Sequence, residues 1–324
     1  MKFYFAPLEG IAGYIYRKAY HDFYGGGICK YFTPFIAVSQ NGLTKRKELE
    51  EVSPTNNKGM AVVPQLLGNK GREITGYLYC LQEMGYEEVN LNIGCPYQTV
   101  VSKKKGAGLL ADTDYLNKFL EEVFADAPVA VSVKTRIGME RAEEFEKILE
   151  VYNQYPIAEL IVHPRVRADF YKNSPSLSAF SYAVQKSRAV VCYNGDIFTQ
   201  KAYQGIIKDF PGVDRIMLGR GLLANPGLLL EILSGAPGEP ASEKEKLKAF
   251  HDRVYQDYRG VLSGDTGVLF KMKELWNYMQ YLFTDREKHI KKIRKASRAA
   301  EYERAVESLF GCCEMVPGAG FGEG

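Results

Sequence analysis

The chain has 324 residues, of which 46% are hydrophobic and 25% charged, and its formal net charge is +3. This composition excludes a disordered or fibrous protein, and the length allows one large domain of roughly 200 to 250 residues beside a smaller one. A charge this small excludes a global positive field, so any contact with nucleic acid must come from a local basic patch.

The cysteines and the amino terminus indicate the compartment. Six cysteines are scattered along the chain without a CxxC pair or a His-rich tract, which favours reduced thiols and no metal site. The first apolar run has only a few residues, far fewer than the roughly 20 of a spanning helix, and it is too short for a signal peptide. We expect a cytoplasmic, monomeric protein without a membrane segment.

Short apolar segments typical of strands recur through the first two thirds of the chain. They cover residues 3–7, 29–36, 60–67, 88–95, 129–135, 158–163, 189–194 and 214–218. Segments with helical spacing lie between them, at 14–23, 72–84, 115–124, 142–155, 177–186, 201–209 and 228–233, and a more polar one at 44–52. Eight strand and helix units favour an α/β fold with a TIM (β/α)8 barrel over an open doubly wound sheet. No GxGxxG follows the first strand, which weakens the open-sheet alternative.

A run of turn-forming residues at 235–240 separates the alternating strand and helix patterns from a region in which only helical patterns follow. A capping box of Ser242 and Glu245 precedes the first of these helices. The predicted helices cover residues 247–258, 269–283, 287–299 and 301–310. We therefore predict a barrel at 1–238, a small all-α helical-bundle domain at 239–310 and a flexible tail at 311–324.

The predicted helix at 287–299 is strongly basic and includes Lys291, Lys292 and Lys295. Such a helix could neutralise several phosphates of a nucleic acid, and it could equally be an ordinary solvated surface. The residues of this helix alone leave both interpretations open.

The fourth predicted strand ends in Gly94, Cys95 and Pro96. Polar and apolar residues alternate before it, so Asn90 and Asn92 should point to the same face. Catalytic groups gather at the carboxyl ends of barrel strands, which would place Cys95 at the lip of a site. The alternative is a buried structural thiol in a turn.

Polar residues also end the other predicted strands. Gln65, Lys134 and His163 would be costly inside an apolar barrel unless a ligand met their hydrogen bonds, by about 1 to 3 kcal/mol for each unsatisfied group. His163 alone could instead be a core histidine. The last two strand ends, 194–196 and 219–221, combine glycines with Arg220, as a phosphate site after strands seven and eight of a barrel requires. A fixed cation such as Lys134 would stabilise the reduced form of a redox ring.

These strand ends together resemble the tRNA-dihydrouridine synthase family. The matching segments are Ala6-Pro7-Leu8 with Gly10, Gln65-Leu66-Leu67-Gly68, Asn92-Ile93-Gly94-Cys95-Pro96, Lys103 with Gly106-Ala107-Gly108, Val133-Lys134-Thr135-Arg136-Ile137-Gly138, His163-Pro164-Arg165, Asn194-Gly195-Asp196 and Gly219-Arg220-Gly221. The chain departs from the family pattern at Leu8, at Pro164 and in the loop 171–178, which affects substrate detail more than the reaction.

The resemblance implies a TIM barrel with a small helical carboxyl-terminal domain that binds tRNA. It also implies that FMN, reduced by NADPH, delivers hydride to C6 of specific D-loop uridines, while Cys95 protonates C5, which gives dihydrouridine. The implied cofactor-binding residues are Ala6, Pro7, Leu8, Gln65, Asn92, Lys134, His163, Asn194, Gly195, Asp196, Gly219 and Arg220. The substrate-binding residues that we expect are Lys103, Arg136, Arg165, Lys291, Lys292 and Lys295.

Two other functions compete with this one. An FMN-dependent dihydroorotate or dihydropyrimidine dehydrogenase would act on a free pyrimidine, but such an enzyme needs no basic helical domain. A non-catalytic tRNA-binding protein could keep the fold, but it would need neither Cys95 nor a complete phosphate site.

Overall fold

The computed structural model describes residues 1–40 and 42–321, which form two compact units. The barrel unit consists of Met1–Glu9, Cys29–Asp196 and Phe210–Met217. The helical unit consists of Gly10–Ile28, Ile197–Asp209 and the chain from Leu218 onward. Because these units reflect packing and not order along the chain, the predicted domain boundaries at 238 and 310 stay predictions.

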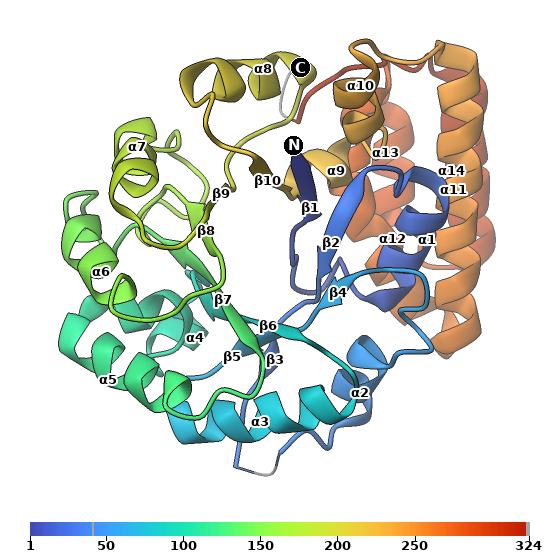
Figure 1. Ribbon diagram of the computed structural model, residues 1–324. Coiled ribbons are helices and arrows are strands. Elements are labelled where there is room, and N and C mark those ends of the chain that lie inside the picture. Colours follow the sequence, from blue (N-terminus) through green and yellow to red (C-terminus); the bar gives the residue numbers. More distant parts are fainter. Residues whose placement is uncertain (41, 322–324) are drawn as a thin grey trace. The chain divides into compact units, whose positions relative to one another are not determined.

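The strands form one sheet in the order β3-β5-β6-β7-β8-β9-β10-β1-β2-β4, and every pairing described in detail is parallel (Figure 1). The strands are β1 (Lys2–Phe5), β2 (Ile28–Phe32), β3 (Ile36–Ala37), β4 (Val62–Val63), β5 (Gln65–Leu67), β6 (Glu88–Ile93), β7 (Ala130–Arg136), β8 (Leu160–His163), β9 (Val191–Tyr193) and β10 (Arg215–Leu218). They fall within or beside the eight segments predicted from apolar runs.

Two prolines explain why ten strands make an eight-stranded barrel. Pro34 separates β2 from β3, and Pro64 separates β4 from β5, because proline has no N–H for the ladder. The two halves of the second physical strand pair with the two halves of the third, β2 with β4 and β3 with β5. The ends of the strand order are thus neighbouring strands, so the sheet closes on itself. This confirms the predicted (β/α)8 barrel.

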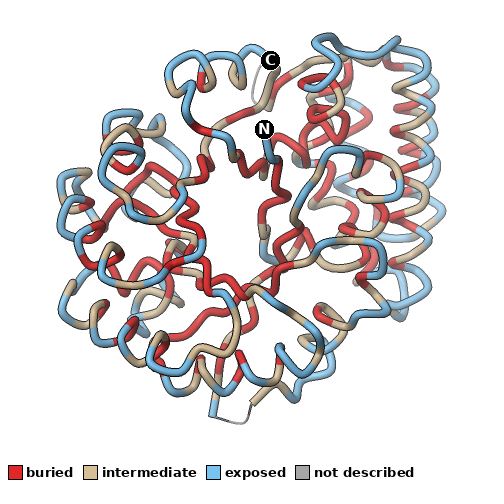
Figure 2. Tube along the Cα trace, viewed as in Figure 1, coloured by how far each residue is buried: buried red, intermediate tan, exposed pale blue. Residues whose placement is uncertain are grey.

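Alternation along the strands fills the barrel with side chains. One buried cluster in its interior contains Tyr4, Ala6, Phe32, Val63, Ile161, Cys192 and Met217. In β8 every residue from Leu160 to His163 is buried, as expected for a parallel strand covered on both faces. Figure 2 shows these strands as buried segments.

Helices cover the outside of the strands in the barrel unit. They are α2 (Arg46–Val52), α3 (Gly71–Glu83), α5 (Thr113–Phe124), α6 (Glu144–Tyr152) and α7 (Leu177–Lys186), all predicted from helical spacing. The short α4 (Gln98–Val101) and the 3-10 helix η1 (Gly106–Ala111) were not predicted. In α3, for example, Ile74, Leu78 and Leu81 are buried, at spacings of four and three residues.

The amino-terminal end of the barrel is closed by charges that pair with one another. Lys30 contacts Glu88 at 2.6 Å and Glu159 at 3.1 Å, and Arg215 approaches Glu159 at 3.5 Å. Glu159 is only 1% exposed, so these partners are needed to compensate its buried charge. Polar groups at the opposite, carboxyl-terminal end are therefore the ones available for a ligand.

The helical unit contains α1 (Tyr14–Tyr24), α8 (Gln200–Asp209), α9 (Arg220–Ala224), α10 (Leu228–Ser234), α11 (Pro240–Val261), α12 (Gly264–Met279), η2 (Gln280–Leu282), α13 (Glu287–Lys295) and α14 (Ala299–Cys312). This confirms the predicted helical carboxyl-terminal region. Its core includes a buried polar group, in which Trp276 Nε1 donates to the hydroxyl of Tyr302 at 2.9 Å and that hydroxyl lies 2.7 Å from His251 Nε2. None of the described helices is long and apolar enough to span a membrane.

The predicted capping box of α11 is wrong. The side chain of Glu239 accepts a hydrogen bond from the backbone N–H of Ser242 at 2.8 Å, and Pro240 occupies the first turn. The helix therefore begins before Ser242, because Glu239 supplies the cap and proline suits a position whose N–H has no helical partner.

Candidate active site

The inward-facing positions of the central strands become polar toward their carboxyl ends. Gln65 pairs in register with Asn90, Asn90 with Ser132, and Asn92 with Lys134. Because side chains alternate along a strand, these residues share one face. Ala6, His163 and Asn194 likewise lie two residues beyond Tyr4, Ile161 and Cys192 of the interior cluster. The expectation that Asn90 and Asn92 face the same way is confirmed.

Hydrogen bonds join four of these side chains into one directional chain, here called the amide chain. Asn90 Nδ2 donates to Ser132 Oγ at 2.9 Å, Gln65 Nε2 to Asn90 Oδ1 at 2.8 Å, and Asn92 Nδ2 to Gln65 Oε1 at 2.8 Å. Asn90, Gln65 and Ser132 are fully buried. Each amide thus uses its N–H group for one neighbour and its oxygen for the other, and Asn92 directs its oxygen away from Gln65, at the end of the chain opposite Ser132.

That oxygen holds the turn that carries Cys95. Asn92 Oδ1 accepts from the backbone N–H of Cys95 at 2.9 Å and of Gly94 at 3.1 Å. Cys95 is 8% exposed, and burial raises the pKa of its thiol above the ordinary value of 9.0. The thiol therefore stays protonated at neutral pH and can act as an acid.

Gly106 allows its segment to pack closely against Cys95. A Cβ atom at Gly106 would lie 2.9 Å from Cys95 Cβ, and the residue has a φ of +56°, which L side chains rarely adopt. The next residue, Ala107, donates its N–H to the carbonyl of Cys95 at 3.1 Å. The segment that the sequence offered as a Gly-Ala-Gly motif thus packs directly on the cysteine turn.

Lys134 supplies a cation on the same inward face. Burial, together with the positive charge of Arg136, lowers the pKa of Lys134 to about 8. No hydrogen bond or ion pair within the described residues uses its Nζ atom. A partly buried ammonium without a carboxylate is costly by itself, and it indicates a place for a ligand that accepts hydrogen bonds.

The lowered pKa of Lys134 predicts how stability depends on pH. Between pH 8 and 10.5 the unfolded chain still holds a proton that the folded chain has released, so the free energy of unfolding rises with pH. We expect Lys134→Met to be more stable than the wild type at pH 7 in the absence of ligands. The difference between the free energies of unfolding of Lys134→Met and the wild type should shrink by about 2 kcal/mol between pH 8 and 10, as measured by urea unfolding. If the free energies of unfolding of the two proteins changed with pH in parallel, the lowered pKa of Lys134 would be contradicted.

Arg136 and Arg165 hold loops at this end of the barrel. Arg136 is 1% exposed and donates to the carbonyls of Gly94 at 3.1 Å, Val166 at 2.8 Å and Phe170 at 2.6 Å. Arg165 forms a two-pronged ion pair with Asp196 and lies 3.2 Å from His163 Nε2. Most of their donors are thus engaged within the protein, and a direct contact with substrate stays a prediction for both.

The predicted phosphate residues fall into both units. In the barrel unit, Asn194 Nδ2 donates to the carbonyl of Met217 at 2.8 Å, and Gly195 allows a close approach, since a Cβ there would lie 2.1 Å from the Tyr193 hydroxyl. In the helical unit, Gly219 precedes α9, and the guanidinium of Arg220 lies over the ring of Phe198 at 5.2 Å. Their shared role at a phosphate stays a prediction.

The four predicted substrate-binding lysines, unlike the two arginines, are exposed. Lys291, Lys292 and Lys295 lie on α13, whose Ile290 and Ile293 are buried. None of the three lysines has an ion-pair partner among the described residues, whereas Lys45, Lys70 and Lys248 are paired with nearby carboxylates. In the barrel unit Lys103 is exposed as well, while its neighbour Lys105 donates to the carbonyl of Val38 at 3.1 Å.

Sequence reasoning missed one group of residues beside Cys95, here called the rim cluster: Tyr97, Arg167 and Phe170. Tyr97 is 55% exposed, and the centroid of its ring lies 6.3 Å from that of the Phe170 ring. The guanidinium of Arg167 lies 5.5 Å from the Phe170 ring. The feature of the sequence that could have indicated this cluster is the aromatic Tyr97 directly after Cys95-Pro96.

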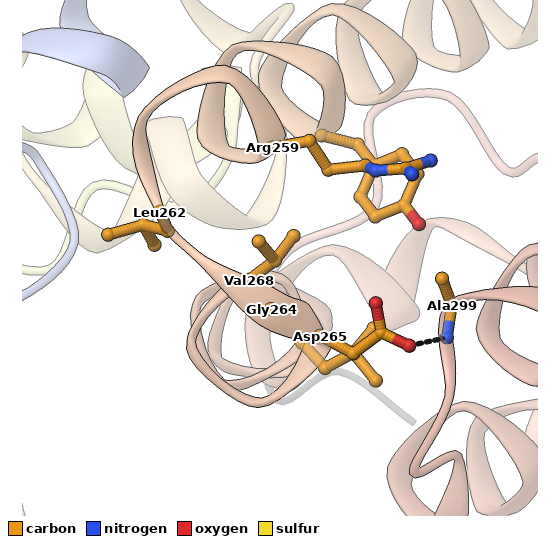
Figure 3. A pocket seen from close by; sticks show the side chains of 8 residues that line it. Arg259, Leu262, Gly264, Asp265, Val268 and Ala299 are labelled. Atoms are coloured by element: carbon orange, nitrogen blue, oxygen red, sulfur yellow. Dashed lines mark hydrogen bonds between the residues drawn. The ribbon is translucent and has the colours of Figure 1, made fainter.

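A separate cavity of about 180 Å³ lies in the helical unit between the end of α11 and the starts of α12 and α14 (Figure 3). Its charged groups already have partners. Asp265 Oδ2 accepts from the backbone N–H of Ala299 at 2.6 Å, and Arg259 pairs with Glu303 at 3.4 Å. This arrangement joins the helices and does not suggest chemistry.

The chain is similar to known proteins along most of its length. The family model described as dihydrouridine synthase matches residues 4–310. A tRNA-dihydrouridine(16) synthase from Salmonella typhimurium is 26% identical over 95% of this chain and 99% of the relative. The protein of the same name from Aquipseudomonas alcaligenes is 30% identical over 72% of this chain and 76% of the relative. Among solved structures, morphinone reductase matches with a TM-score of 0.53 and 12% identity over 74% of this chain and 87% of that one, which shows the fold.

Proposed function

The chain belongs to the dihydrouridine synthase family, and on this premise we propose that it reduces the C5=C6 bond of uridines in tRNA. The proposed cofactor is FMN, and the proposed reductant is NADPH. The observation that carries the proposal is the protonated, nearly buried thiol of Cys95, whose backbone N–H donates to Asn92 Oδ1, on the same side of the barrel as the cation of Lys134.

The donors around Cys95 fit the polar edge of a flavin ring. Lys134 offers an ammonium without a described partner, and the amides of Gln65 and Asn92 each keep an N–H that the amide chain does not use. A cation and neutral donors at one edge suit the carbonyl oxygens and ring nitrogens of a flavin. When bound and reduced by NADPH, the flavin would supply the hydride for C6 of the uracil ring.

The protein itself supplies the proton. The Cys95 thiol would transfer its proton to C5 of the uracil, leaving a thiolate. The positive charges of Arg136 and Lys134 both favour that thiolate, while burial opposes it and keeps the thiol protonated beforehand. Solvent then returns the proton to sulfur. His163 and Ala6, on the same inward-facing layer, would bound the space for the reacting rings.

We propose position 16 of the tRNA D-loop as the target, because the relatives compared above carry that position in their names. The test is to map dihydrouridine in tRNA from cells that lack this protein. We expect its loss at position 16 only, and its return when purified protein, FMN and NADPH are added to that tRNA. Unchanged dihydrouridine at every position would reject the function. Loss elsewhere would reject only the position.

The unpaired lysines of α13 should bind tRNA phosphates. Replacing Lys291, Lys292 and Lys295 by Glu reverses their charges and should weaken tRNA binding. It should also reduce the magnitude of the negative slope of log affinity against log salt by up to about 3. The rate of flavin reduction by NADPH should not change. The matched control reverses three exposed lysines on barrel helices, Lys118, Lys147 and Lys186, with the same change in net charge. Equal losses in both variants would mean that only overall charge matters.

A further inference from the structure

The rim cluster exposes aromatic surface two residues beyond Cys95. Tyr97 is 55% exposed, although a large aromatic side chain gains free energy from burial. Its ring packs edge-on against Phe170, with centroids 6.3 Å apart and planes at 71°. The contact joins the loop after β6 to the loop after β8, so the exposed ring is supported from behind.

The backbone at Phe170 is held in an uncommon conformation. Its φ is +51°, and only Lys104 and Asp285 share a positive φ among the described non-glycine residues. Such a conformation is costly for a bulky side chain and persists where the surroundings fix it. Here Arg136 donates to the carbonyl of Phe170 at 2.6 Å. The constraint keeps the ring beside Tyr97.

Arg167 completes the cluster with a flat cation. Its Nε donates to the carbonyl of Pro96 at 3.2 Å, and its NH2 group donates to the side chain of Gln98. No ion pair within the described residues involves Arg167. The cluster thus combines a supported aromatic ring with a guanidinium whose charge is not neutralised, and RNA-binding proteins use these two groups to stack unpaired bases.

We propose that the rim cluster binds a nucleotide adjacent to the target uridine in the substrate RNA, with its base stacked on Tyr97. This inference rests on the proposed function. The reacting uracil must reach Cys95, which is 8% exposed, whereas Tyr97 lies farther along the same turn and is open to solvent. Tyr97 therefore meets a neighbouring base. Because every base has a π-face, the cluster orients the RNA and selects an unstacked loop, with little preference for base identity.

The test compares Tyr97→Ala with Tyr97→Phe, using an unmodified tRNA transcript and the FMN-loaded protein. We expect Tyr97→Ala to raise KM for tRNA about 10-fold, since stacking on one aromatic ring contributes roughly this much or more to affinity. Tyr97→Phe keeps the ring and should stay within about twofold of the wild type. Flavin reduction by NADPH should be equal in all variants.

Two further variants test whether the effect is specific to Tyr97 and its supporting ring. Tyr79→Ala removes an equally large exposed tyrosine, 42% exposed on α3, and should leave KM unchanged. Phe170→Gly removes the supporting ring at a position where glycine relieves the positive φ, so it should fold well and still raise KM. An unchanged KM in Tyr97→Ala, or equal effects of Tyr97→Ala and Tyr97→Phe, would overturn the inference. A wild-type protein that binds tRNA without forming dihydrouridine would instead reject the proposed function, and tRNA affinity would still test Tyr97.

Discussion

Cys95→Ala should bind FMN and accept electrons from NADPH normally, yet form dihydrouridine about 10²- to 10⁴-fold more slowly, which is the usual contribution of a general acid. The expected loss follows from the structure, because the thiol is protonated and the turn that carries it is held by the backbone N–H groups of Gly94 and Cys95, which both donate to Asn92 Oδ1. The measurement is a single turnover of reduced, FMN-loaded protein on unmodified tRNA.

The chain provides matched controls for this substitution. Cys29 is exposed and Cys80 partly exposed, and neither is among the residues described for the site. Cys29→Ala and Cys80→Ala should turn over like the wild type. Full activity of Cys95→Ala would eliminate Cys95 as the proton donor, whereas a loss in all three variants would indicate a general effect of removing thiols.

Asn92→Ala should lower the rate of dihydrouridine formation on the order of 10²-fold, because a displacement of about 1 Å at a reacting group can cost that much. The substitution removes the oxygen that accepts from the N–H groups of both Gly94 and Cys95. We expect Asn92→Asp, which keeps an acceptor but loses the donor to Gln65, to recover part of the rate. The measurement is single-turnover rate, with FMN content determined for each variant.

Flavin binding separates two explanations of that loss. If Asn92 acts mainly by placing Cys95, Asn92→Ala keeps most of its FMN and is reduced by NADPH at the normal rate. If activity falls only in proportion to FMN content, Asn92 acts through the cofactor and the positioning role is wrong. Tyr152→Phe is a suitable control, since it breaks a buried hydrogen bond to Thr135 on the opposite face of β7.

Short-range patterns predicted most elements of the fold. Strands with apolar runs and helices with three- and four-residue spacing were found because burial imposes those periods on the sequence. The short α4, η1 and α9 were missed because four to six residues are too few to show a period. The cap of α11 was misplaced because Glu239 replaces the more usual Ser or Asp at such a position.

The candidate site was predicted less completely than the fold. Gln65, Asn92, Lys134 and His163 were identified as polar residues at strand ends, and the structure places them on inward-facing positions. Tyr97 and Phe170 were not connected, since 73 positions separate them along the chain and only the two loops bring their rings together. Arg136 and Arg165 were identified, but the sequence does not show that backbone carbonyls and Asp196 occupy their donors.

The sequence by itself determined the barrel class, the family resemblance and the cysteine at a strand end, because these depend on residue type and spacing along the chain. Only the tertiary structure decided which atoms meet. The closure of the barrel through strands divided by Pro34 and Pro64, the direction of the amide chain from Ser132 to Asn92, and the position of the Arg167 guanidinium over the Phe170 ring all depend on strand register and loop geometry. A shift of one residue in register would point each side chain to the other face of the sheet, and no local pattern specifies the partner strand's register.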